Sequence, residues 1–274
     1  MAEVLGVSVS GYYSYRKRKA SHREKKNRKL LKRIQKIHID SKGVYGSRKI
    51  TAKLNEKAKS KVNHKRVERL MQENGIYAKV SRKYRVTTDS NHNLPVAENL
   101  LNREFETEEI NQKMVSDISF IPTAEGWLYV AAIMDLCGNK IIGLSMSNRI
   151  TKELVIAALE DAHGRSGQIE GCILHSDRGS QYCSREYREK LAEYGFVCSM
   201  SRSGDCWDNA PMESFWGKMK TEWLNEKHFQ TREEAKAAVF EYIWIFYNRK
   251  RLHAANGYMT PEKYYELHKN KVAA

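Results

Sequence analysis

Three carboxylates in the sequence lie on separate predicted elements and have the chemistry of a divalent-metal site: Asp117, Asp177 and Glu213. Asp117 lies inside an apolar run typical of a strand, where an uncompensated charge is costly. Asp177 follows the short run Ile173-Leu174 and opens a polar, glycine-containing segment typical of a strand end. Carboxylate oxygens suit Mg²⁺ or Mn²⁺, which keep several waters and bind substrate phosphates. Two such ions roughly 3.5–4 Å apart would activate a nucleophilic oxygen and stabilise the departing one.

Glu213 is predicted to lie on a helix that begins near Asn209, with Asn209 as the N-cap and Pro211 in the first turn. The apolar residues of this helix recur at helical spacing and form one packing stripe: Met212, Phe215, Trp216, Met219 and Trp223. Glu213 and Lys220 lie on a different face, so the carboxylate points away from the stripe. We expect Lys220 to hold a DNA phosphate beside the metal ions.

Residue types alone leave other assignments open at this site. The competing carboxylates, which spacing does not exclude, are Asp135, Asp161, Asp205, Asp208 and Glu222. His175 lies two residues before Asp177 and could act as a general base or as a supporting group, and we favour a structural hydrogen bond. For every one of these carboxylates the plain alternative is a solvated surface residue.

Charge is unevenly distributed along the 274 residues, whose net charge is +15. Residues 1–104 carry 27 Lys and Arg against 9 Asp and Glu, a net charge of +18, and the remainder carries −3. A basic N-terminal third favours nucleic acid as the partner, and the alternative is a solvated charged coil. No apolar run reaches membrane-spanning length, so we expect no membrane association. The five cysteines form no CxxC pair and no zinc spacing, which suits a reducing compartment and a cytoplasmic protein.

The basic third divides into two predicted helical segments and a linker. Residues 1–40 are predicted to hold part of a helix-turn-helix and a basic helix, and residues 41–80 a helix-turn-helix module whose second helix is capped by Asn63. Residues 81–113 contain few apolar positions and are predicted to be the linker. The basic residues on the module that we expect to contact DNA phosphates are Arg48, Lys49, Lys65, Arg66 and Arg69. A merely solvated basic surface is the alternative.

Residues 114–225 are predicted to form the core domain. Strand patterns over 114–121, 127–136 and 140–147 precede a helix over 151–163 and then a strand–helix–strand–helix order. This order predicts an α/β fold with a mixed sheet, three antiparallel strands followed by parallel ones, flanked by helices. Residues 226–274 are predicted to be a helical extension, with a long helix over 231–249 and a short one from Thr260-Pro261.

Three motifs of the core are unusually specific. They are Val115-Ser116-Asp117-Ile118-Ser119, His175-Ser176-Asp177-Arg178-Gly179-Ser180-Gln181-Tyr182, and Cys206-Trp207-Asp208-Asn209-Ala210 running into Met212-Glu213-Ser214-Phe215. The chain thereby resembles the second reading-frame product of IS-three family insertion-sequence transposases. That family's D-D-E pattern has 35 residues between its second Asp and its Glu, as do Asp177 and Glu213 here, with a basic residue seven positions later at Lys220. Upstream, Val44-Tyr45-Gly46-Ser47-Arg48-Lys49-Ile50 matches the family's helix-turn-helix.

The resemblance implies a ribonuclease-H-like catalytic core related to retroviral integrases. Asp117, Asp177 and Glu213 would be the catalytic residues and would bind two Mg²⁺ (or Mn²⁺) ions, with His175 and Asn209 as supporting residues. The implied reaction is metal-dependent cleavage and strand transfer on element ends and target DNA, by a homo-oligomer at the bacterial nucleoid. The family also implies an upstream-frame protein as partner or fusion. Cys137-Gly138-Asn139, Met212 and Trp216 depart from the residues common in the family.

Two other functions remain open on the sequence. One is a non-catalytic DNA-binding protein or repressor, the product of a decayed element; the other is a ribonuclease-H-type nuclease acting on RNA–DNA hybrids. The presence of all three carboxylates argues against the first, and the basic N-terminal module argues against the second. We therefore interpret the chain as a DDE transposase.

Overall fold

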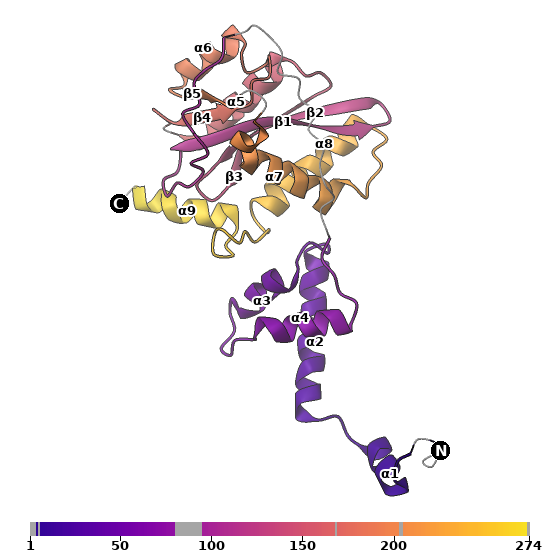
Figure 1. The fold of residues 1–274 in the computed structure, drawn as a ribbon. Coiled ribbons are helices and arrows are strands. Elements are labelled where there is room, and N and C mark those ends of the chain that lie inside the picture. The colour runs from indigo at the N-terminus through magenta and orange to yellow at the C-terminus, as the bar shows by residue number, and fades with distance from the viewer. Residues whose placement is uncertain (1–3, 5, 80–94, 168, 203–204, 273–274) are drawn as a thin grey trace. The chain divides into compact units, whose positions relative to one another are not determined.

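The computed structural model describes residues 4, 6–79, 95–167, 169–202 and 205–272 (Figure 1). The chain forms two compact units, an N-terminal unit, Met1–Ala78, and a C-terminal unit, Lys79–Ala274. Among the described residues, no helix is long and apolar enough to cross a membrane.

The N-terminal unit is helical, as predicted. Its helices are α1 (Val9–Lys17), α2 (His22–Asp40), α3 (Ser47–Asn55) and α4 (His64–Glu73). The Asn63 side chain accepts a hydrogen bond from the N–H of Lys65 and so caps α4, as expected. Apolar residues spaced at three and four positions pack α2, α3 and α4 into one small core: Leu30, Ile34, Ile50, Leu54, Val67 and Leu70. Helix α1 buries no residue, so it does not contribute to that core.

The C-terminal unit is built on a five-stranded sheet with strand order β3-β2-β1-β4-β5. Strands β1 (Lys113–Thr123), β2 (Gly126–Asp135) and β3 (Lys140–Ser147) are antiparallel. Strands β4 (Ile173–Ser176) and β5 (Val197–Met200) continue the sheet in parallel with β1. The mixed α/β sheet predicted from the element order is therefore confirmed, and β1 is its central strand.

Helices cover the sheet on both faces (Figure 1). Helices α5 (Lys152–Ser166) and α6 (Arg185–Glu193) share a buried apolar cluster with alternate residues of β1 and β2, such as Met114 and Ile133. Helix α7 (Ala210–Met219) packs on β1, and α8 (Arg232–Phe240) on β1 and β2. Both continue as π-helical turns, Lys220–Leu224 and Glu241–Tyr247, and α9 (Pro261–Val272) is the last helix described.

The segment before β1 contains no regular helix or strand over residues 95–112 but contacts the core. Leu101 is fully buried, and the backbone N–H groups of Leu100 and Leu101 donate to Oγ of Ser199 in β5. The part of the predicted linker that falls on residues 81–94 lies outside the described residues. Leu100 and Leu101 therefore attach this segment to the sheet edge formed by β5.

Candidate active site

Asp117 lies in the middle of β1, where its carboxylate is held at both oxygens. Oδ1 accepts the backbone N–H of Ile118 at 2.8 Å, and Oδ2 accepts the indole Nε1–H of Trp216 at 3.0 Å. Trp216 comes from α7, and its side chain is 3% exposed. The strand therefore presents an oriented carboxylate that remains partly accessible.

Asp177 lies directly after β4, beside β1. The parallel register pairs Val115 with His175, so extending it by two residues sets Asp177 beside Asp117. Oδ1 of Asp177 accepts the N–H of Gly179 at 2.8 Å. A Cβ at position 179 would lie 3.0 Å from that oxygen, so a glycine permits this tight turn. Parallel pairing and the turn together position the second carboxylate.

Glu213 lies in the first turn of α7, half-buried and outside the packing stripe. The five stripe residues named above are all buried, as predicted. The expected cap is wrong in one respect, because the Asn209 side chain makes no capping hydrogen bond to the helix. Instead its Nδ2 donates to the carbonyl of Ser116 at 2.9 Å. Asn209 thus ties the start of α7 to the residue that precedes Asp117.

Ser116 also receives the segment that follows Asp177. Its Oγ lies 3.0 Å from the Tyr182 hydroxyl, and both side chains are buried. The carbonyl of Ser116 binds α7 and its hydroxyl binds the segment after β4. Ser116 therefore joins the elements that carry the three carboxylates.

The three carboxylates influence one another electrostatically. Burial raises the pKa of Asp117 well above its usual range, and the negative charges of Asp177 and Glu213 raise it further, against the hydrogen bonds from Ile118 and Trp216. Burial also raises the pKa of Glu213. Among the described residues no group of three or more His, Cys, Asp or Glu side chains already stands in metal-ligand geometry. Asp177 and Glu213 therefore both influence the ionisation of Asp117.

The donor set fits a hard divalent cation. All three groups are carboxylates, and oxygen donors of this kind bind Mg²⁺ or Mn²⁺. Mutual repulsion in a partly desolvated site is the condition that a cation relieves. The chemistry of the residues is therefore compatible with the metal.

Lys220 turns toward the same region. Its Nζ lies 5.1 Å from the centre of the Phe120 ring on β1. Burial lowers the pKa of Lys220, while the charge of Asp117 opposes this effect. A cation near Asp117 is thus part of the site's charge balance.

Comparison with known proteins agrees with this geometry. Residues 107–206 and 194–261 match two family models, both described as an integrase core domain, and residues 25–84 match an HTH-like domain. The chain is 44% identical over 271 residues to the uncharacterized 31 kDa protein of insertion element IS600 from Shigella sonnei, covering 97% of this chain and 99% of the relative. It is 38% identical over 266 residues to transposase InsF for insertion sequence IS3A from Escherichia coli (strain K12), covering 96% and 92%. The chain belongs to the IS3 family of insertion-sequence transposases.

Two solved structures show weaker likeness to this transposase. A simian T-cell lymphotropic virus intasome in complex with a PP2A regulatory subunit matches with a TM-score of 0.49 at 12% identity, covering 85% of this chain and 74% of that one. The HTLV-2 integrase catalytic core in complex with magnesium matches with a TM-score of 0.45 at 14% identity, covering 57% and 97%. The assignment of an integrase-type core, and with it a polynucleotidyl transferase, rests on the family models, the close relatives and the strand order.

The competing carboxylates of the transposase are engaged elsewhere. Each one accepts hydrogen bonds from nearby backbone or side-chain donors: Asp135, Asp161, Asp205, Asp208 and Glu222. Asp208, for example, is fully buried and is bound by Arg103 and Arg202. Although burial acts in the opposite direction, these hydrogen bonds hold the pKa of Asp208 well below its usual range. These five carboxylates serve local structure.

His175 is enclosed by serines. Its Nδ1 lies 2.9 Å from Oγ of Ser199 and its Nε2 lies 3.0 Å from Oγ of Ser201. Because Ser199 Oγ already accepts two backbone N–H groups, its hydroxyl proton is directed to Nδ1, which leaves the ring proton on Nε2. Burial lowers the pKa of His175 to about 4. The imidazole is thus engaged at both nitrogens and connects β4 with β5 and the segment that follows it.

The five basic residues named on the N-terminal unit differ in their surroundings. Arg66 donates two hydrogen bonds to Oδ1 of Asn27, at 3.0 and 2.6 Å, and so links α4 to α2. Arg69 lies 3.6 Å from Glu73, and Lys49 lies 5.5 Å from the Tyr45 ring. Arg48 and Lys65 are exposed. Arg66 therefore has a structural contact that the sequence pattern did not indicate.

Proposed function

We propose that Asp117, Asp177 and Glu213 are the catalytic residues of this transposase and that they bind Mg²⁺ or Mn²⁺, two ions in all. The observation that carries the proposal is geometric. The parallel register of β1 and β4 sets Asp177 beside Asp117, and a hydrogen bond from Trp216 joins the helix that carries Glu213 to the same strand. When bound, such ions supply activation of the attacking oxygen and stabilisation of the departing one. The chain's own contribution is to hold these carboxylates in place.

The residues around the carboxylates support their orientation. Trp216 and the Ile118 N–H restrict the rotation of Asp117, and the Gly179 N–H restricts that of Asp177. Ser116 connects the neighbouring elements through Asn209 and Tyr182. Such preorganisation lowers the cost of assembling a reactive geometry. His175 and Asn209 are therefore proposed as supporting residues.

The proposed reaction is phosphodiester exchange on DNA. Water attacks the phosphorus, the bond from phosphorus to the 3′-oxygen breaks, and that oxygen takes a proton to give a 3′-hydroxyl. The 3′-hydroxyl then loses its proton and attacks a phosphorus of the target. The bond from that phosphorus to the target's 3′-oxygen breaks, and the departing oxygen takes a proton. Lys220, whose Nζ lies near the Phe120 ring on β1, would bind a DNA phosphate beside the carboxylates.

DNA would also be bound by the N-terminal unit. Its HTH-like domain and its basic residues support contact with phosphates by Arg48, Lys49, Lys65, Arg66 and Arg69. We further propose that residues 41–80 act as the DNA-binding module, 114–225 as the catalytic core and 226–274 as a helical extension. The protein would act at the bacterial nucleoid as a homo-oligomer, with an upstream-frame protein as partner or fusion.

The test is nicking of supercoiled plasmid with Mn²⁺, Mg²⁺ or EDTA, followed by strand transfer on oligonucleotides. Metal-dependent nicking that is lost in Asp177→Asn and Glu213→Gln supports the assignment. Glu160→Gln is the matched control, because Glu160 lies exposed on α5. Nicking that survives both site substitutions contradicts it.

A further inference from the structure

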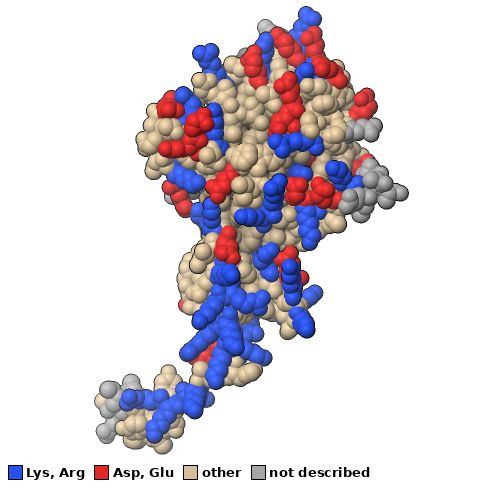
Figure 2. All heavy atoms as spheres, turned by 180° about the vertical axis from the view of Figure 1, so that it is seen from behind, with Lys and Arg blue, Asp and Glu red and all other residues tan. Residues whose placement is uncertain are grey.

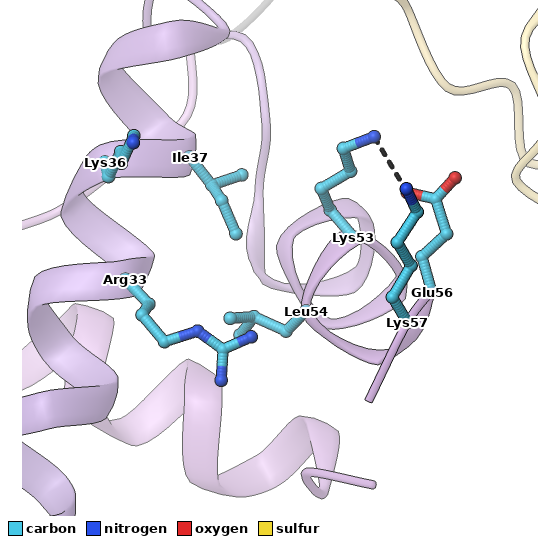
Figure 3. Close-up of a pocket in the computed structure, with 7 residues that line it drawn as sticks. All are labelled: Arg33, Lys36, Ile37, Lys53, Leu54, Glu56 and Lys57. Carbon is cyan, nitrogen blue, oxygen red and sulfur yellow. Dashed lines mark hydrogen bonds and ion pairs between the residues drawn. The ribbon is translucent and has the colours of Figure 1, made fainter. Parts of the chain in front are cut away.

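An open groove of about 400 Å³ lies between α2 and α3 of the N-terminal unit (Figure 3). Ile37 of α2 and Leu54 of α3 form its apolar floor, and Leu54 is 2% exposed. Charged residues surround this floor: Arg33 and Lys36 on α2, Lys53 on α3, and Glu56 and Lys57 just after α3. None of the five basic residues named for DNA contact lines the groove.

The charges of the groove are incompletely balanced. Lys53 forms an ion pair with Glu56 at 2.8 Å, the interaction drawn in Figure 3. Arg33, Lys36 and Lys57 are exposed and make no hydrogen bond or ion pair with the residues that the structure describes. Three cations thus remain available around an apolar floor. An anion with adjoining C–H surface would match both features.

We propose that this groove binds the sugar–phosphate backbone of DNA, with phosphates at Arg33, Lys36 and Lys57 and deoxyribose against Ile37. The proposal rests on the DNA binding proposed above and adds a second phosphate-contact surface to the same unit. Contacts of this kind position a protein on DNA without reading its sequence.

A long polyanion fits the unit better than a short acidic peptide. Residues 1–78 carry 22 Lys and Arg against 6 Asp and Glu, so positive charge extends far beyond the groove. Figure 2 shows Lys and Arg side chains gathered along this unit. A duplex that presents phosphates at regular intervals would use the groove together with the five basic residues named for DNA contact.

The test is the salt dependence of binding of the full chain to a labelled short DNA duplex of arbitrary sequence. Each phosphate contact contributes a slope of about −0.9 to log K against log salt. The triple variant Arg33→Gln/Lys36→Gln/Lys57→Gln should make the slope shallower by about 2–3. The matched control is Lys25→Gln/Lys59→Gln/Lys61→Gln, which removes the same charge from exposed positions outside the groove.

Glu56→Gln should change DNA binding in the opposite direction to the triple variant, because it releases Lys53 from its ion pair. DNA affinity should rise and the slope should steepen by up to about 1. Unfolding followed by circular dichroism verifies that each variant folds.

Equal slopes of log K against log salt for the groove triple variant and the control triple variant overturn the groove assignment. They leave DNA binding by the N-terminal unit intact. Absence of DNA binding by the unsubstituted chain overturns the proposed DNA binding itself, and the groove assignment with it. If the groove substitutions weaken binding of a poly-glutamate peptide and leave the DNA slope unchanged, the groove recognises an acidic protein segment, and the DNA assignment is wrong.

Discussion

The indole Nε1–H of Trp216 donates a hydrogen bond to Oδ2 of Asp117 across 3.0 Å. Trp216 lies three residues after Glu213 on α7, so this contact joins the helix with one proposed ligand to the strand with another. Trp216 also fills the apolar layer between helix and sheet, where it is 3% exposed. It is therefore a positioning residue for Asp117.

Replacement of Trp216 by Phe should weaken Mn²⁺ binding roughly tenfold, because a hydrogen bond to a charged group contributes about 1.5–3 kcal/mol and 1.4 kcal/mol is tenfold in affinity. The measurement is free Mn²⁺ by electron paramagnetic resonance during titration, with nicking as a second readout. Trp223→Phe is the matched control, because the Trp223 ring stacks on the Phe246 ring, with the ring centres 5.0 Å apart, and does not hydrogen-bond to Asp117. Equal Mn²⁺ affinities in the two variants would exclude the positioning role.

The contrast between Trp216 and Asp117 shows what sequence patterns can predict. Asp117 interrupts an apolar strand, and the cost of a charge there indicated a special role. Trp216 fits its packing stripe perfectly well as an apolar residue, so periodicity gives no sign that its N–H also has a partner. The order of helices and strands along the chain followed from local patterns, whereas this hydrogen bond depends on how α7 packs on β1.

The partner of Asn209 was missed for a similar reason. Asn before a helix usually caps it, and local sequence predicts that role. Here the amide donates to the Ser116 carbonyl, 93 residues away in sequence, and such a partner exists only once the sheet has formed. Competition between local and tertiary partners is not visible in a single sequence.

Arg251 and Glu222 form a buried ion pair, with Nε of Arg251 2.7 Å from Oε2 of Glu222. The Tyr242 hydroxyl donates to the same carboxylate oxygen. Arg251→Met should reduce the free energy of unfolding by about 3–5 kcal/mol, because Glu222 would remain buried without its cation. The double variant Glu222→Gln/Arg251→Met should recover part of that loss. Guanidinium unfolding measures both, and no recovery would contradict the electrostatic explanation.

Asp135 should make stability depend on pH. Burial raises its pKa from 3.8 to about 7, against hydrogen bonds from the N–H groups of Asn111 and Cys137. The folded state therefore holds a proton that the unfolded state releases, and this stabilisation is lost as pH rises from about 4 to about 7. Relative to wild type, Asp135→Asn should gain about 2–3 kcal/mol between pH 5 and pH 8, at about 1.4 kcal/mol per unit. Urea unfolding at both pH values measures this gain. If the variant and wild type differ in free energy of unfolding by the same amount at pH 5 and pH 8, the raised pKa of Asp135 is contradicted.

Gly143 in β3, at the contact with α5, and Gly164, exposed in α5, provide a matched pair of glycines. A Cβ at Gly143 would lie 2.4 Å from the backbone carbonyl of Ala158 and 2.8 Å from Cβ of Ala162, so α5 would have to move away from the sheet. Gly143→Ala should therefore destabilise the protein by roughly 1–3 kcal/mol, the usual cost of overpacking.

Gly164 lies in α5 with nothing within 4 Å of its added Cβ. Gly164→Ala should stabilise the protein by about 0.5–1 kcal/mol, because alanine loses less backbone entropy in a helix. Thermal unfolding of the two variants should move in opposite directions. Since α5 covers the face of the sheet that holds Met114, only Gly143→Ala should also disturb β1, and with it the Mn²⁺ affinity of the site. Equal affinity in the two variants would show that strain at α5 does not reach Asp117.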